Sequence, residues 1–136
     1  MTTKTSYGTT VQLNKPFAAA VEATRAALAA EGFGILMEAD LQATFQKKLG
    51  AEHTPYVILG ACSPRDAFEA LKLEPDLGLL LPCNVIVRDA GDGVSHVAAI
   101  DPVVQLALTG NTDLGPAAAA IQERLARAMA ALAALP

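Results

Sequence analysis

Tryptophan is absent from this sequence, and other aromatic residues are scarce: four Phe and two Tyr make up 4% of 136 residues. Positive charge is also limited, because ten Lys and Arg are outnumbered by fourteen Asp and Glu, which gives a net charge of −4. The longest basic run is the pair Lys47–Lys48. Proteins that bind nucleic acid usually present a basic patch, and single-strand binders add aromatic rings for base stacking. The composition therefore argues against a nucleic-acid partner.

The sequence also lacks an apolar run long enough for a membrane-spanning helix, which needs about 18–20 residues. The nearest candidate is the Ala-rich stretch 116–136, which Gln122, Glu123, Arg124 and Arg127 interrupt. The segment Met1–Thr5 does not have the charged and apolar regions of a signal peptide. We therefore expect no membrane association and a cytoplasmic location.

Catalytic signatures are missing as well. The sequence contains none of the strings that mark phosphate loops, zinc proteases, serine hydrolases or EF-hands. Its two cysteines match no zinc-binding spacing, and in a reducing compartment we expect free thiols rather than a disulfide. The residues thus indicate no metal set, and they leave open which cofactor, if any, the chain binds and whether it is an enzyme.

What is present is the composition of a globular protein, with 52% hydrophobic and 18% charged residues. The length suits a single domain spanning 1–136. Apolar periodicity, caps and turn residues predict the elements. The expected strands are 9–13, 33–38, 55–61, 78–89 and 94–101, and the expected helices are 15–31, 41–49, 64–73 and 116–134, with a helical turn at 103–108.

The order of these elements predicts the fold class. Gly91-Asp92-Gly93 supplies the positive φ angles of a tight turn and predicts a hairpin between the last two strands. Helices that interrupt hairpin-connected strands are typical of α+β proteins. The long helices 15–31 and 116–134 each carry one apolar stripe. We therefore predict a mainly antiparallel sheet with helices packed on one face.

The two cysteines lie in informative surroundings. Cys62 ends a strand and precedes a helix that Ser63 is expected to cap, and a helix start favours a thiolate and lowers the pKa of a thiol. Cys83 follows Pro82, and strand alternation places it on one face with Leu79, Leu81, Val85 and Val87. The alternative is that both are small buried hydrophobic residues, as free cysteines often are.

Two histidines complete the set of candidate groups. His53 lies in a polar loop and is expected at the surface, whereas His96 alternates with Val94, Ala98 and Ile100 on a half-buried strand face. A catalytic Cys–His pair needs hydrogen-bond contact and a third group that orients the base. Nothing in the spacing indicates such an arrangement.

Four strings together resemble the domain of unknown function 302 family. They are Gly32-Phe33 with Glu38, the run 56–64, Glu74-Pro75 through Leu81-Pro82-Cys83-Asn84-Val85, and Asp101-Pro102. The resemblance covers nearly the whole chain and implies a β-α-β4-α fold of the TATA-binding-protein-like class, and dimers. It implies no reaction. Family members usually have Asn where this chain has Ser63, so any role of that amide is lost or altered here.

Because both cysteines fall in the family's most recognisable strings, we predict a site for a small ligand or a soft metal, Cu(I) or Zn, around them. The candidate ligand-binding residues are Cys62, Ser63, Cys83, Asn84 and His96, with both thiols reduced, metal-free without ligand, close to the surface, and Cys62 the more reactive. One alternative is a thiol redox or sulfur-handling protein that uses Cys62. A third hypothesis is an assembly module, and we expect a homodimer in any case, because the apolar chain has few charges to cover its sheet.

Overall fold

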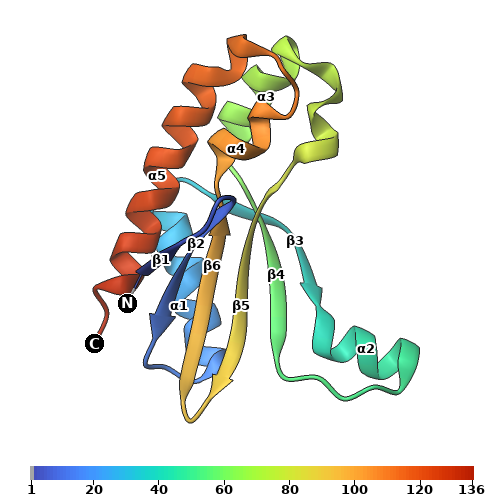
Figure 1. The fold of residues 1–136 in the computed structure, drawn as a ribbon, viewed down its shortest axis with the longest axis vertical. Coiled ribbons are helices and arrows are strands. Elements are labelled where there is room, and N and C mark those ends of the chain that lie inside the picture. The colour runs from blue at the N-terminus through green and yellow to red at the C-terminus, as the bar shows by residue number, and fades with distance from the viewer. Residues whose placement is uncertain (1) are drawn as a thin grey trace.

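The computed structural model of the chain describes residues 2–136 and has the predicted α+β class (Figure 1). The strands are β1 Thr2–Lys4, β2 Gly8–Leu13, β3 Gly34–Asp40, β4 Tyr56–Cys62, β5 Cys83–Gly91 and β6 Val94–Ile100. The α-helices are α1 Phe17–Ala30, α2 Leu41–Leu49, α3 Pro64–Leu73, α4 Pro102–Ala107 and α5 Gly115–Ala133. Two short 3₁₀ helices, η1 Pro75–Leu80 and η2 Thr112–Leu114, complete the set.

All six strands form one sheet in the order β1-β2-β6-β5-β4-β3, and every neighbouring pair is antiparallel. The predicted hairpin joins β5 to β6, and Gly91, Asp92 and Gly93 all have positive φ. The expected count of five strands omitted β1, because Thr2-Thr3-Lys4 has no apolar side chain to reveal a strand. The TATA-binding-protein-like class that the resemblance implies stays a prediction.

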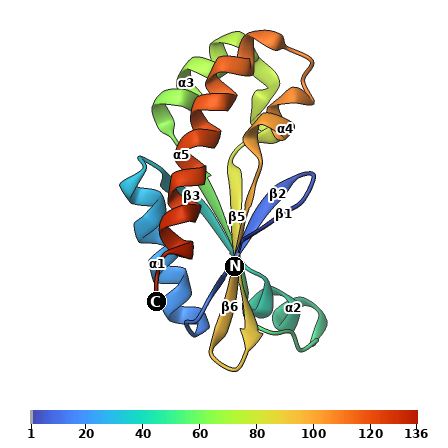
Figure 2. The same ribbon diagram turned by 60° about the vertical axis from the view of Figure 1, so that its left-hand side comes forward.

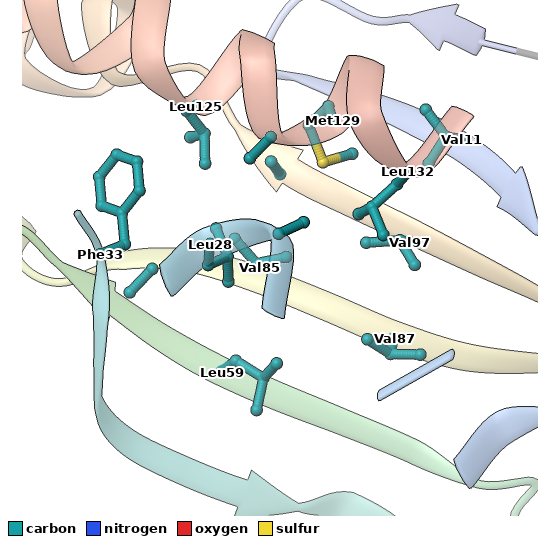
Figure 3. Packing of buried hydrophobic residues seen from close by; sticks show 14 of the residues in the cluster. Val11, Leu28, Phe33, Leu59, Val85, Val87, Val97, Leu125, Met129 and Leu132 are labelled. Atoms are coloured by element: carbon teal, nitrogen blue, oxygen red, sulfur yellow. The ribbon is translucent and has the colours of Figure 1, made fainter. Parts of the chain in front are cut away.

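The main core lies between the sheet and two long helices. Alternate residues of β2, β4, β5 and β6 point to the side where α1 and α5 pack, so that Leu59, Val85 and Val97 are fully buried. Figure 3 shows Val85 of the sheet close to Leu28 of α1, and Leu125 of α5, which belongs to the same buried cluster, pointing toward the sheet. The prediction that both long helices cover one face is confirmed.

The expected strand at 78–89 was wrong at its beginning. Residues 75–80 form η1, Leu81 and Pro82 connect it to β5, and the strand starts only at Cys83. Pro75 fixes the first turn of η1, while Leu77 anchors it in a second small core with Ala70, Leu106, Leu114 and Ala118. An apolar run alone does not distinguish a strand from a buried helical turn.

The opposite face of the sheet has no helix packed across it in the described residues. Figure 2 shows the sheet nearly edge-on, with α1 and α5 on one side and α2 at the lower end of the other side. None of the helices in residues 2–136 combines the length and apolar character needed to cross a membrane. Because the sheet separates a covered face from an uncovered one, alternation along each strand decides where every candidate residue lies.

Candidate functional site: the uncovered face of the sheet

Cys83 lies on the covered face and belongs to the main core. It is 4% exposed, and its register partner on β4 is the equally buried Ala61. Burial, with a smaller contribution from Cys62, raises the pKa of the Cys83 thiol to about 11. The structure therefore agrees with the alternative that Cys83 is a core residue, and the expectation of a surface position for it was wrong.

Cys62 follows Ala61 at the end of β4, so alternation directs its side chain toward the uncovered face. It is half-buried, and burial raises the pKa of its thiol. The predicted lowering of this pKa by the start of α3 was wrong, because desolvation outweighs any effect of the helix dipole. The two cysteines are neighbours in register but point to opposite faces, so the strand geometry does not bring their sulfurs to one shared ligand.

Ser63 belongs to a hydrogen-bonded network between α3 and α5. Its hydroxyl donates to Asp66 Oδ2 at 2.6 Å instead of accepting from a backbone N–H at the start of α3, so the expected side-chain cap is not formed. Arg124 of α5 donates to Ser63 Oγ, forms an ion pair with Asp66, and donates to the carbonyl of Glu31. Ser63 thus helps to fasten α3 to α5.

Asn84 and His96 both lie on the uncovered face. Asn84 is exposed and pairs with Gly60, and His96 is half-buried and pairs with Arg88 on one side and Gln12 on the other. Of the five candidate residues, the structure therefore places Cys62, Asn84 and His96 on one face. They are spread along it rather than gathered at a point.

A polar row crosses this face over four strands. Tyr56 of β4, Arg88 of β5, His96 of β6 and Gln12 of β2 are successive register partners. Directly opposed residues of an antiparallel pair have Cβ atoms about 4.5–5.5 Å apart, so these side chains are neighbours. Sequence reasoning missed Arg88, Tyr56 and Gln12. The available signal was the period-two alternation that puts Arg88 on the same face as Asn84 and Ile86.

The electrostatics of the row are unusual for a sheet surface. Arg88 is a half-buried residue, yet the ion pairs found within residues 2–136 do not include it. Nδ1 of His96 is a buried atom without a hydrogen-bond partner in the described part of the chain. Desolvation, with a smaller contribution from Arg88, lowers the pKa of His96, which keeps the imidazole neutral at pH 7.

The row is flanked by apolar and aromatic groups. The next row contains Ile58, Ile86 and Ala98, which are register partners across β4, β5 and β6. At its β4 end, Tyr56 meets the ring of His53 at 6.1 Å, and His53 meets Phe45 of α2 at 5.3 Å. His53 is exposed, as predicted, and its ring links α2 to the polar row.

A separate cavity of about 470 Å³ lies on the covered side, between α5 and the β1–β2–β6 edge. Its lining includes Lys4, Thr9, Ile100, Gln122 and Met129. None of the five predicted site residues lines it. Among residues 2–136, no group of three or more His, Cys, Asp and Glu side chains is placed to hold a metal ion.

Comparison with known proteins identifies the family of this chain and finds a solved structure with a similar fold. Residues 9–132 match the sequence profile of the family described as "Domain of unknown function DUF302". The structure is similar to the crystal structure of an uncharacterized conserved DUF302 protein from Bacillus stearothermophilus, with a TM-score of 0.84 and 27% sequence identity. That similarity covers 94% of this chain and 99% of the other. No functionally curated protein matches the chain.

Proposed function

This chain belongs to the DUF302 family of domains of unknown function, and from that premise we propose that it binds a small organic carboxylate on the uncovered face of its sheet. The observation that carries the proposal is Arg88, a half-buried residue whose guanidinium has no counter-ion among the described residues. Charged groups removed from water are normally paired. A carboxylate supplies the missing partner, because its two oxygens accept a bidentate pair of N–H bonds from guanidinium.

The surroundings of Arg88 support an anion with an apolar portion. His96 is neutral, and Nδ1 needs one hydrogen-bonding group, as donor or acceptor according to the tautomer. Ile58, Ile86 and Ala98 offer hydrocarbon surface beside the row. Cys62 and Asn84 lie toward the other end of the same face, where a longer ligand would reach them. Ser63 and Cys83 are not part of this proposed site.

The test uses butyrate as the probe and its neutral amide, butyramide, as the matched control ligand. We expect butyrate to shift the NMR resonances of His96 and Ile86, and butyramide to shift them much less. Arg88→Gln should weaken butyrate binding at least about tenfold, because it removes the bidentate ionic contact. Arg65→Gln, which changes an exposed arginine on α3, should leave binding unchanged. Equal binding of both probes, or full binding by Arg88→Gln, would contradict the proposal.

The thiol-redox alternative has less support. Burial raises the pKa of both thiols, so that the thiolate fraction at pH 7 is smaller than for a free cysteine. We keep a cytoplasmic location and a homodimer as parts of the proposed function. The homodimer is supported by exposed apolar side chains on β3 and α2, namely Leu36, Met37 and Leu49.

A further inference from the structure

The cavity of about 470 Å³ on the covered side lies where the edge strand β1 extends the sheet. Directly opposed residues of an antiparallel pair project from the same face. Lys4 pairs with Thr9, Thr9 pairs with Ala99, and Ala99 pairs with Val85 of the main core. This register row therefore directs Thr9 and Lys4 to the side of α5, and it changes from polar at the sheet edge to apolar at the core.

Helix α5 forms the opposite wall, and most of its side chains there are short. Ala119, Ala126 and Ala130 line the cavity on the same helical face as Gln122 and Met129, because these positions recur at intervals of three and four residues. Figure 3 shows Met129 projecting from α5 toward the sheet. Alanine ends at its Cβ atom, so these positions leave room that longer side chains would fill. The resulting volume falls within the roughly 300–1,000 Å³ typical of sites for small molecules.

Two polar side chains of the lining lack hydrogen-bond partners. Thr9 on β2 and Gln122 on α5 are both half-buried. Within residues 2–136, neither the Thr9 hydroxyl nor the Gln122 amide takes part in a hydrogen bond. Polar groups withdrawn from water are normally hydrogen-bonded. Each of these two groups can donate and accept, so together they suit a ligand with one hydroxyl or amide group.

The charged groups of the lining offer no dedicated counter-charge to a bound ion. The carboxylate of Asp101 accepts two backbone N–H bonds at the start of α4, and that of Glu123 pairs with Arg127. Lys4 is exposed, so its ammonium group keeps its water. An ion that enters an apolar cavity loses hydration, and without a partner this loss is costly. The lining therefore favours an uncharged ligand.

We infer that this cavity binds an uncharged, mainly apolar small molecule that carries one hydroxyl or amide group. Its polar group bonds to Thr9 and Gln122, and its hydrocarbon portion lies against Ala126 and Met129. The site is separate from the one proposed for a carboxylate, because the sheet lies between them. It therefore stands or falls independently of that proposal.

The experiment is an NMR titration of the full chain with hexan-1-ol, and hexanoate is the matched charged probe. We expect hexan-1-ol to shift the methyl resonances of Met129 and Ile100, which line the cavity, and to leave those of Ile86 on the opposite face unchanged. Hexanoate should bind the cavity at least about tenfold more weakly, because its charge loses water without gaining a partner. If hexan-1-ol leaves Met129 unshifted, or if hexanoate shifts Met129 with equal affinity, the inference is overturned.

Two substitutions on α5 test the position of the ligand. Ala126→Phe fills the cavity from an exposed position and should weaken hexan-1-ol binding at least about tenfold, because the ring occupies the space of the hydrocarbon portion. Ala120→Phe is the matched control, since Ala120 is an exposed alanine of the same helix outside the lining, and it should bind normally. Circular dichroism shows whether each variant is folded. Normal binding by folded Ala126→Phe overturns the inference.

A third substitution tests the polar contact and does not depend on filling the cavity. Gln122→Leu keeps a side chain of similar size without the amide, and it should weaken hexan-1-ol binding about fivefold through the lost hydrogen bond. Unchanged affinity of Gln122→Leu overturns the assigned ligand class. Arg88→Gln should bind hexan-1-ol normally while it loses butyrate, so that the failure of either site is recognised separately.

Discussion

Cys62 and Cys83 lie one register position apart, yet strand alternation gives them different surroundings. Ala61 pairs with Cys83 and turns inward with it, while Cys62, the next residue, turns outward. Burial raises the pKa of both thiols, and it raises that of Cys83 to about 11. The proximity of a helix start therefore does not make Cys62 acidic, since the loss of hydration has the larger effect.

The difference in burial predicts the order of alkylation by iodoacetamide. At pH 8 a thiol of pKa about 11 is about one part in a thousand thiolate, and Cys83 is also inaccessible, so it should react only on unfolding. Cys62 should react first, with a rate that rises about tenfold per pH unit from pH 7 to 8 because its pKa lies above that range. Mass spectrometry of the parent and of Cys62→Ser and Cys83→Ser measures both rates. A Cys62 rate that levels off below pH 8 would instead indicate a low-pKa redox thiol.

Arg88 and His96 show how one side chain changes the pKa of its neighbour. Desolvation lowers the pKa of His96, and the positive charge of Arg88 adds to this lowering, so the neutral imidazole is favoured. A neutral imidazole next to a guanidinium avoids like-charge repulsion and still offers a hydrogen-bonding nitrogen. The pair therefore combines one fixed positive charge with one neutral polar group, which suits a single carboxylate better than a polyanion.

At the scale of elements, the sequence predicted those whose signal is local. Helix α2, expected at 41–49, is preceded by Asp40, whose side chain accepts from the N–H of Ala43, and is followed by Gly50 in the left-handed conformation. β1 was missed because three polar residues at an edge carry no apolar alternation, and η1 was taken for strand because Leu79–Leu81 is apolar. Caps and apolar alternation along a short segment therefore predict that a helix or strand forms there. The residues that pack against that element come from distant parts of the chain, so the local pattern does not predict them.

The candidate site shows the same difference between what local sequence predicts and what tertiary packing decides. Period-two alternation predicted that His96 shares a face with Val94, Ala98 and Ile100. The register places Ala98 on that face, whereas Ile100, at the end of β6, packs against the main core. The row Tyr56–Arg88–His96–Gln12 joins four strands from distant parts of the chain, so no sequence spacing reveals it. The side of the sheet that α1 and α5 cover is likewise settled by tertiary packing.

The contacts between α3 and α5 predict how much Arg124 contributes to the stability of the fold. Arg124 binds Ser63, Asp66 and the carbonyl of Glu31, and its guanidinium lies 5.2 Å from the centre of the Phe33 ring. Arg124→Met should lower the free energy of unfolding by about 1–3 kcal/mol, because Asp66 loses its charged partner in a half-buried setting. Arg127→Met is the matched control: that arginine is 52% exposed, and its contacts to Glu31 and Glu123 are screened by water, so the loss should be clearly smaller. Urea denaturation measures both, and equal losses would contradict this account.

At the scale of the whole molecule, the fold is asymmetric about its sheet. One face is closed by α1 and α5 over a continuous core, and the other, which carries the polar row beside apolar side chains, has no helix packed across it (Figures 1 and 2). A chain with this design lowers its free energy further when the second face is also removed from water. Stability and assembly should therefore be coupled, so that part of the free energy of unfolding depends on protein concentration.

This coupling predicts that the melting temperature rises with concentration. For a dimer that unfolds to two separate chains, a hundredfold increase in concentration adds about 3 kcal/mol per dimer. The unfolding enthalpy is about 0.7 kcal/mol per residue near 60 °C, or about 190 kcal/mol for two chains of 136 residues. The expected rise is then about 5 °C per hundredfold, measured by calorimetry or circular dichroism. A chain whose melting temperature does not vary with concentration would contradict both this coupling and the proposed homodimer.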